Sequence, residues 1–166
     1  MEPSAPRTGY APVNGLQMYY EIHGAPRDDA PPLLVLHGAL ATLDMFGNLV
    51  PMLARHRQVV AAEMQGHGRT ADIDRPLRAD LMADDVAALL GYLGITRVDL
   101  FGFSMGGGVA WQVAIRHPEL VRRLVAGSAS PFRTHGHVAA TEGLGATFTP
   151  EVFAGTPIEI DYKRVA

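Results

Sequence analysis

The hexapeptide at residues 102–107, Gly-Phe-Ser-Met-Gly-Gly, constrains the fold of this chain more than any other segment. It follows residues 97–101, an apolar run with the length and composition of a buried strand. It precedes residues 108–117, which have the pattern of a helix that ends at Pro118. Because glycine lacks a Cβ atom, the glycines around Ser104 permit a tight turn and close packing of the helix. A G-x-S-x-G sequence between a strand and a helix predicts a strained turn that raises the serine hydroxyl into a cleft.

Length and composition limit the classes of protein to which the chain can belong. With 166 residues, of which 48% are hydrophobic, it is long enough for one domain with a substantial core. The net charge is −3 and no block of Lys or Arg is present, so we expect no nucleic-acid partner. The chain has no cysteine, which excludes disulfides and cysteine-based metal sites. The sequence also lacks a secretory signal and an apolar stretch of about 18 residues, so we expect a cytoplasmic protein without a membrane partner.

Apolar patterning predicts a hairpin followed by alternating strands and helices. Asn14-Gly15 is a strong turn signal between runs at 9–13 and 16–22, because both turn positions accept a positive φ. Further strands are expected at residues 32–36, 58–62, 97–101 and 123–126, and helices at 45–54, 78–93 and 108–117. This order predicts an α/β fold whose sheet becomes mostly parallel and is flanked by helices.

Differences in composition and apolar periodicity divide the chain into three segments. Residues 1–8 are expected to form a flexible tail, and residues 9–130 to hold the core. Residues 131–166 are rich in Gly, Thr, Pro and His and have weak periodicity, so we expect the start of an insertion over the sheet. No acidic residue lies at ligand spacing around His135 and His137, which predicts a solvated loop and no metal site there.

Three short motifs, each directly after an expected strand, resemble those of the α/β-hydrolase superfamily, in its small esterase, lactonase and perhydrolase-like branch. They are His37-Gly38-Ala39-Leu40, Gly66-His67-Gly68-Arg69-Thr70 and the hexapeptide around Ser104. The resemblance covers about residues 9–130. It implies the α/β-hydrolase fold, truncated in its cap region.

The resemblance also implies a role for each part of a candidate site. Ser104 would be the nucleophile, and it would form a covalent acyl-enzyme. The backbone N–H groups of Ala39 and Met105 would form the oxyanion hole. In the family the acid and the histidine of the triad follow later strands, so we expect both beyond residue 166. On this interpretation the chain is the N-terminal part of a longer hydrolase.

Several other polar residues have simpler interpretations. We expect His37 to be a buried structural hydrogen-bonding group and not a catalytic base. For His67 the chemistry of a glycine-flanked turn is sufficient, and Asp84 and Asp85 are expected on a solvated helix face. Glu63 lies where the family usually has an aspartate, in a loop that is generally structural.

The leading functional hypothesis is a serine hydrolase that acts on a small, fairly apolar carboxylic ester or lactone, without cofactor or metal. A cofactor-free perhydrolase of the same fold is an open alternative, and so is a non-catalytic binding protein that retains the fold. If residues 1–166 exist alone, the strand at 123–126 leaves an apolar sheet edge unpaired. We therefore also expect self-association through that edge.

Overall fold

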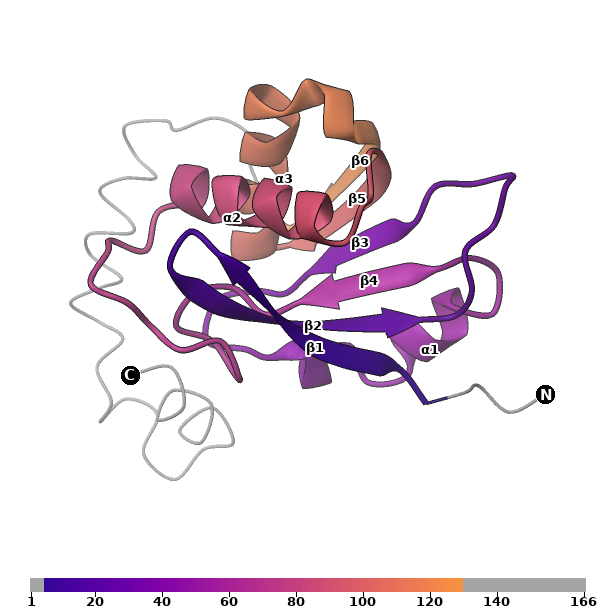
Figure 1. Cartoon of the computed structure of the whole chain (residues 1–166), viewed down its shortest axis with the longest axis horizontal. Helices are drawn as coiled ribbons and strands as arrows, with labels where there is room; N and C mark the ends of the chain where they lie inside the picture. Colours follow the sequence, from indigo (N-terminus) through magenta and orange to yellow (C-terminus); the bar gives the residue numbers. More distant parts are fainter. Residues whose placement is uncertain (1–4, 130–166) are drawn as a thin grey trace.

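The computed structural model describes residues 5–129 of the chain, which form one sheet with helices on both faces (Figure 1). The six strands lie in the order β1-β2-β4-β3-β5-β6. They are β1 (Arg7–Val13), β2 (Leu16–His23), β3 (Leu33–Leu36), β4 (Val59–Ala62), β5 (Val98–Phe103) and β6 (Val121–Gly127). The helices are α1 (Leu49–Leu53), α2 (Ala79–Tyr92) and α3 (Met105–Arg116), with short 3-10 helices η1 (Leu43–Phe46) and η2 (Pro118–Leu120).

Strand pairing confirms the expected mostly parallel α/β sheet. β1 and β2 form an antiparallel hairpin around Asn14 and Gly15, whose φ angles are 48° and 86°. β2 also pairs antiparallel with β4, whereas β4, β3, β5 and β6 run parallel to one another. The carboxyl ends of β3, β4 and β5 therefore share one edge of the sheet, and the three motifs follow these ends.

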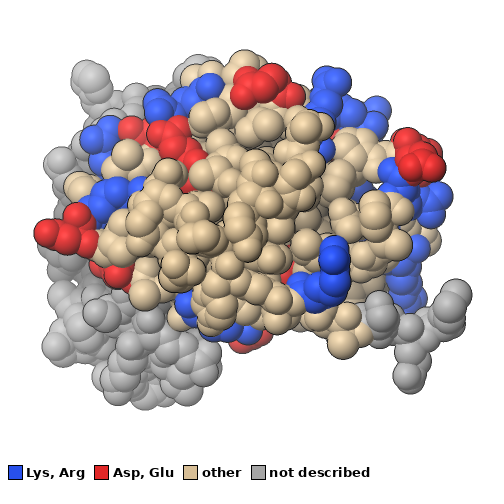
Figure 2. Space-filling view, viewed as in Figure 1, with Lys and Arg blue, Asp and Glu red and all other residues tan. Residues whose placement is uncertain are grey.

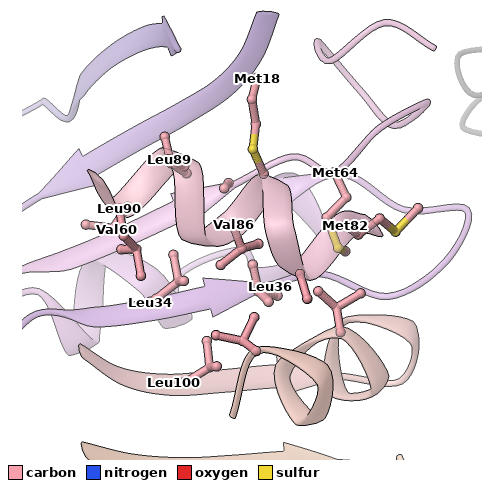
Figure 3. Packing of buried hydrophobic residues seen from close by; sticks show 14 of the residues in the cluster. Met18, Leu34, Leu36, Val60, Met64, Met82, Val86, Leu89, Leu90 and Leu100 are labelled. Atoms are coloured by element: carbon pink, nitrogen blue, oxygen red, sulfur yellow. The ribbon is translucent and has the colours of Figure 1, made fainter. Parts of the chain in front are cut away.

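The central strands are buried on both faces. In β3, Leu34 and Leu36 belong to a core covered by α2 and α3, whereas Val35 belongs to a second core covered by η1 and α1. Figure 3 shows the first core, in which side chains of α2 point toward those of β3, β4 and β5. Its labelled members are Met18, Leu34, Leu36, Val60, Met64, Met82, Val86, Leu89, Leu90 and Leu100. Burying a side chain of this size contributes about 1.5–3 kcal/mol, so these contacts hold the strand ends in place.

Several boundaries differ from the sequence prediction, and two of these differences have a local cause. The helix expected at 45–54 is two short helices, η1 and α1. The Thr42 hydroxyl accepts a hydrogen bond from the Asp44 N–H at 3.2 Å and starts η1, and Gly47 with a φ of 48° ends it. The tail expected at 1–8 is also too long, because Arg7 and Thr8 pair with the far end of β2 and extend β1.

The expected insertion at 131–166, including His135 and His137, lies outside the described residues. Within residues 5–129, β6 ends the strand order and pairs only with β5. Val125 on this strand is 60% exposed. Self-association through this edge stays a prediction.

Charged side chains of both signs lie mainly around the rim of the face drawn in Figure 2, and its centre is uncharged. No single-sign block covers this face. No helix within residues 5–129 has both the length and the apolar character needed to cross a membrane.

Candidate active site

Ser104 occupies a strained turn between β5 and α3. Its φ and ψ angles are 52° and −115°, a conformation that is rare for residues other than glycine. The turn is held by a hydrogen bond from the Ser104 N–H to the Gly127 carbonyl at 2.8 Å, and by one from the Gly108 N–H to the Ser104 carbonyl at 3.1 Å. Strain of this kind costs about 1–3 kcal/mol and persists where the surrounding structure enforces it. The serine is exposed at the tip of the turn, so the expected strand–turn–helix arrangement is confirmed.

Two glycines make this turn sterically possible. A Cβ atom on Gly102 would overlap the carbonyl group of Gly106, because the turn folds back on itself there. A Cβ atom on Gly106 would overlap the carbonyl oxygens of Leu36 and His37. The first turn of α3 is therefore packed directly on the backbone at the end of β3.

The turn after β3 lies against the serine turn. A Cβ atom on Gly38 would be 3.6 Å from the Ser104 Cβ atom and 3.3 Å from the Phe103 ring. Ala39 follows in the same turn and is exposed, and Met105 is the first residue of α3. Within residues 5–129, the N–H groups of Ala39 and Met105 donate no backbone hydrogen bond. The structure thus brings together the two motifs that sequence analysis assigned to one site.

His37 forms hydrogen bonds through both ring nitrogens, which fixes its protonation state. The Nε2 atom accepts a hydrogen bond from the Met64 N–H at 3.1 Å, so the ring proton must lie on Nδ1. The Nδ1–H group then donates to the Gly38 carbonyl at 2.8 Å. Burial lowers the pKa of His37 to about 4, so the ring is neutral near pH 7. The prediction that His37 is a structural hydrogen-bonding group is confirmed.

His67 is more than the turn residue that the sequence indicated. Its side chain is buried, and its Nδ1 atom lies 2.8 Å from the Gln65 carbonyl oxygen. Its ring centroid is 5.0 Å from that of His37. Burial lowers the pKa of His67 as well. The hydrogen bonds of His67 lie within its turn, as expected, and the structure adds the packing of its ring against the histidine that holds the neighbouring turn.

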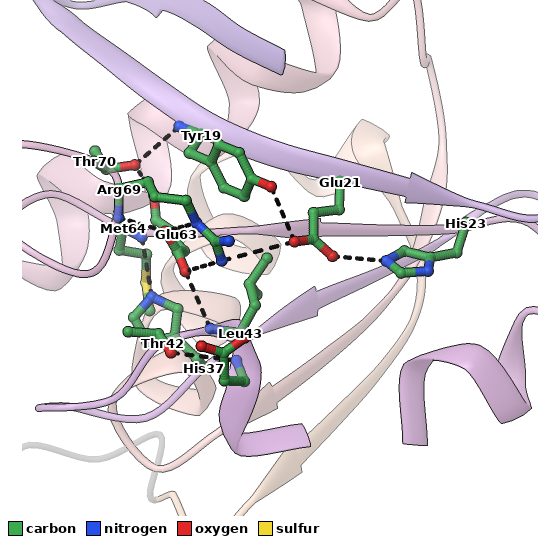
Figure 4. Close-up of polar contacts among 11 residues, drawn as sticks. Tyr19, Glu21, His23, His37, Thr42, Leu43, Glu63, Met64, Arg69 and Thr70 are labelled. Atoms are coloured by element: carbon green, nitrogen blue, oxygen red, sulfur yellow. Dashed lines mark hydrogen bonds and ion pairs between the residues drawn. The ribbon is translucent and has the colours of Figure 1, made fainter. Parts of the chain in front are cut away.

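Glu63 is the centre of a buried polar network (Figure 4). Its carboxylate has no exposed surface and accepts hydrogen bonds from the Leu43 N–H at 3.2 Å and the Arg69 N–H at 2.6 Å. The Arg69 guanidinium adds two contacts, from Nη2 at 2.7 Å and from Nε at 3.1 Å. Burial opposes ionisation of this carboxyl, but the hydrogen bonds from Arg69 and Leu43 outweigh it and lower the pKa of Glu63. The loop after β4 therefore folds around a charged carboxylate, which agrees with a structural role.

The same network continues along one face of β2. The Arg69 guanidinium lies 4.0 Å from the centre of the Tyr19 ring, in a cation–π arrangement. The Tyr19 hydroxyl donates to Glu21 at 3.0 Å, and the other oxygen of Glu21 lies 2.8 Å from His23 Nε2 (Figure 4). Residues 19, 21 and 23 alternate along the strand, so their side chains share a face.

The expectation that Asp84 and Asp85 both lie on a solvated face is wrong for Asp85. Asp85 is 1% exposed and accepts hydrogen bonds from Arg75, at 3.1 Å and 2.5 Å, and from Asn14 at 3.0 Å. Its partners lie in the loop before α2 and in the β1–β2 turn. Asp84 is partly exposed and pairs with Arg116 and with the adjacent histidine.

Within residues 5–129, no three His, Asp or Glu residues are arranged to hold a metal. The hydrogen-bonded histidine rings of the same region bond to groups other than the Ser104 hydroxyl. His37 is unsuited to act as a base because both of its nitrogens are occupied. What this region supplies is a strained serine beside two backbone N–H groups.

Comparison with known proteins identifies the family and the relatives to which this chain is similar. A sequence profile described as "alpha/beta hydrolase fold" matches residues 31–160. The chain is 38% identical over 125 residues to a 2-hydroxymuconate semialdehyde hydrolase from Pseudomonas sp. strain CF600, covering 70% of this chain and 41% of that protein. It is 34% identical over 129 residues to an sn-1-specific diacylglycerol lipase from Danio rerio, covering 76% of this chain and 39% of the lipase. The chain thus spans about two fifths of the length of these relatives.

Solved structures of proteins with hydrolase names are also similar to this chain. The enol-lactonase from Burkholderia xenovorans LB400 has a TM-score of 0.66 and 30% sequence identity, over 70% of this chain and 45% of the lactonase. An alpha/beta hydrolase fold protein from Chitinophaga pinensis has a TM-score of 0.72 and 28% identity, over 90% of this chain and 55% of that protein.

Proposed function

Because the chain belongs to the alpha/beta hydrolase fold family, we propose that it carries the nucleophile and oxyanion hole of a serine hydrolase that cleaves a carboxylic ester or lactone. The observation that carries the proposal is Ser104, a non-glycine residue with a φ of 52° at the tip of a glycine-packed turn. Serine has no local reason to adopt this strained conformation. A hydroxyl held there is free to attack a carbonyl group and to form an acyl-enzyme.

The proposed oxyanion hole uses the backbone N–H groups of Ala39 and Met105. The N–H of Met105 lies at the start of α3, where the helix dipole adds a positive partial charge. The Gly38–Ala39 peptide is oriented by His37, which holds the Gly38 carbonyl at 2.8 Å. Since C=O and N–H point in opposite directions across a trans peptide, this bond directs the Ala39 N–H away from His37. Each donor of this kind contributes about 3 kcal/mol to stabilisation of the transition state.

A base and an acid must complete the chemistry, and we place both outside residues 5–129. The basis for the placement of the base is that the histidine rings with hydrogen bonds in that region bond to groups other than the Ser104 hydroxyl. The substrate class follows from the surroundings of the serine. Phe103 is exposed beside it and no charged side chain belongs to the Gly38–Ala39 turn. We therefore propose a small, apolar acyl group as the part bound at Ser104.

The test is labelling by a fluorophosphonate together with hydrolysis of a short-chain p-nitrophenyl ester. Ser104→Ala should lose both, because the nucleophile is removed. Ser128→Ala is the matched control, since Ser128 is also exposed and also has a positive φ, of 53°. Labelling of Ser104→Ala at the wild-type rate would refute the assignment of the nucleophile.

A further inference from the structure

Gly38, in the turn beside Ser104, is held at both of its backbone polar groups by side chains. Its carbonyl accepts a hydrogen bond from His37 Nδ1 at 2.8 Å. Its N–H donates to the thioether sulfur of Met45 at 3.3 Å. Sulfur is a weak acceptor, so this second contact is the less usual of the two. Gly38 itself is buried.

The two partners of Gly38 differ in their exposure. His37 is completely buried, whereas Met45, which lies in η1, is 42% exposed. The Met45 side chain is therefore open to an oxidant in solution, and the imidazole is not. Most other methionines of the described region are inaccessible, since Met18, Met64 and Met82 are at most 2% exposed.

We propose that Met45 is a site of reversible oxidation by peroxides, and that its oxidation releases the turn beside Ser104. In this step the sulfur of Met45 attacks one oxygen of hydrogen peroxide and the O–O bond breaks. The sulfur gains that oxygen and loses two electrons, and the second oxygen leaves as water after proton transfer. The product is methionine sulfoxide, which methionine sulfoxide reductases return to the thioether.

The geometry determines what oxidation does to the turn. The 3.3 Å between the Gly38 nitrogen and the sulfur is a direct contact, so an oxygen added on the side of the sulfur that faces Gly38 has no space between the two atoms. The side chain of Met45 must then move away, and the sulfoxide is polar and prefers water. The buried Gly38 N–H loses its acceptor, which weakens one of the two contacts that fix the turn. The consequence for catalysis rests on the proposed function, whereas the consequence for Gly38 does not.

The experiment measures the oxidation of Met45 and the release of the turn at Gly38 in the full chain treated with hydrogen peroxide. Mass spectrometry measures sulfoxide at each methionine, and NMR of isotopically labelled glycine amides measures hydrogen exchange at Gly38. We expect sulfoxide at Met45 and exchange at Gly38 that is about tenfold faster, which is the change expected for loss of one hydrogen bond. The part of p-nitrophenyl ester hydrolysis that is lost in Ser104→Ala should fall by a similar factor of about ten, because one oxyanion donor is less well positioned.

Three variants separate this effect from general damage. Met45→Gln keeps an acceptor oxygen that peroxide does not oxidise, so exchange at Gly38 should be insensitive to peroxide. Met45→Leu has no acceptor and should show fast exchange before any treatment. Met52→Leu should respond as the wild type does, because Met52 is 56% exposed but makes no hydrogen bond to the turn.

The inference would be overturned if Met45 remained a thioether while Met52 was fully oxidised, or if exchange at Gly38 was unchanged once Met45 was fully oxidised. Acceleration in Met45→Gln equal to that in the wild type would overturn it as well. If exchange responds as expected but the fluorophosphonate labels Ser104→Ala and the wild type at the same measurable rate, the site at Met45 stands and the proposed function fails.

Discussion

The substitution Glu63→Gln removes the charge of the buried carboxylate while it preserves the length and nearly the volume of the side chain. In the wild type this carboxylate accepts four hydrogen bonds, one from Leu43 and three from Arg69. The amide has only one acceptor oxygen, so its NH₂ group would face N–H donors. The substitution therefore tests whether the loop after β4 depends on a charge.

The contacts set the size of the effect. Breaking a buried ion pair by removing one partner costs about 3–5 kcal/mol. Arg69 is 39% exposed and can be rehydrated, which reduces the loss. We therefore expect Glu63→Gln to lower the free energy of unfolding by about 2–3 kcal/mol near pH 7. A control, Asp80→Asn, removes the surface partner of Arg78 and should change stability far less.

Urea unfolding of the full chain, followed by fluorescence, measures this difference. Trp111 is the single tryptophan of the chain and lies in α3, so its emission reports loss of the packed helix. The difference in the free energy of unfolding between Glu63→Gln and the wild type should also become smaller as the pH falls. Because the folded pKa of Glu63 is lowered from 4.5, its contribution is present above that value and is lost as the pH falls through the folded pKa.

Two results would refute this reasoning. Equal stability of Glu63→Gln and the wild type near pH 7 would mean that the hydrogen bonds do not need a charged acceptor. A difference that stays constant as the pH falls well below 4.5 would mean that ionisation of Glu63 is not its source.

Two further predictions concern the turns beside the serine. The pKa of His37 falls from 6.5 to about 4 on folding, so its contribution to stability is present above pH 6.5 and is lost as the pH falls toward 4. Between these limits the free energy of unfolding of the wild type should fall by about 1.4 kcal/mol per pH unit more than that of His37→Gln. Urea titrations at several pH values measure both, and an equal dependence on pH in the two proteins would contradict this prediction. Gly106→Ala should cost about 2 kcal/mol or more by calorimetry, because its Cβ atom overlaps the carbonyl oxygens of Leu36 and His37. The control Gly108→Ala, in open space on the same helix, should raise stability by about 0.5–1 kcal/mol, and equal effects of the two substitutions would contradict the role of the contact.

Local signals in the sequence predicted most of the fold. Asn14-Gly15 predicted the hairpin turn because its conformation depends only on those two residues. The glycines around Ser104 predicted the strained turn for the same reason, since each glycine relieves a contact within the strand–turn–helix unit or with the adjacent β3. The break at Gly47 was missed, because the apolar pattern continues across it and only the φ of 48° reveals the interruption.

Features that depend on distant partners could not be predicted. Asp85 has the helical spacing of an exposed residue, yet it is buried by Asn14, 71 residues away, and by Arg75. Glu63 was correctly expected to be structural, but its contact with Leu43 arises only when β3 and β4 lie side by side. The packing of His67 on His37 has the same origin, and no spacing rule connects the two rings.

The direct backbone contact between Gly106 and the end of β3 has a consequence for the engineering of this protein. Since a Cβ atom on Gly106 would overlap main-chain atoms of Leu36 and His37, the distance between the start of α3 and the end of β3 is set by main-chain atoms. Libraries that randomise side chains elsewhere leave this spacing intact. Phe103 is different, because its exposed ring also lies against Gly38, so a substitution there changes the packing of the neighbouring turn as well as the surface beside Ser104.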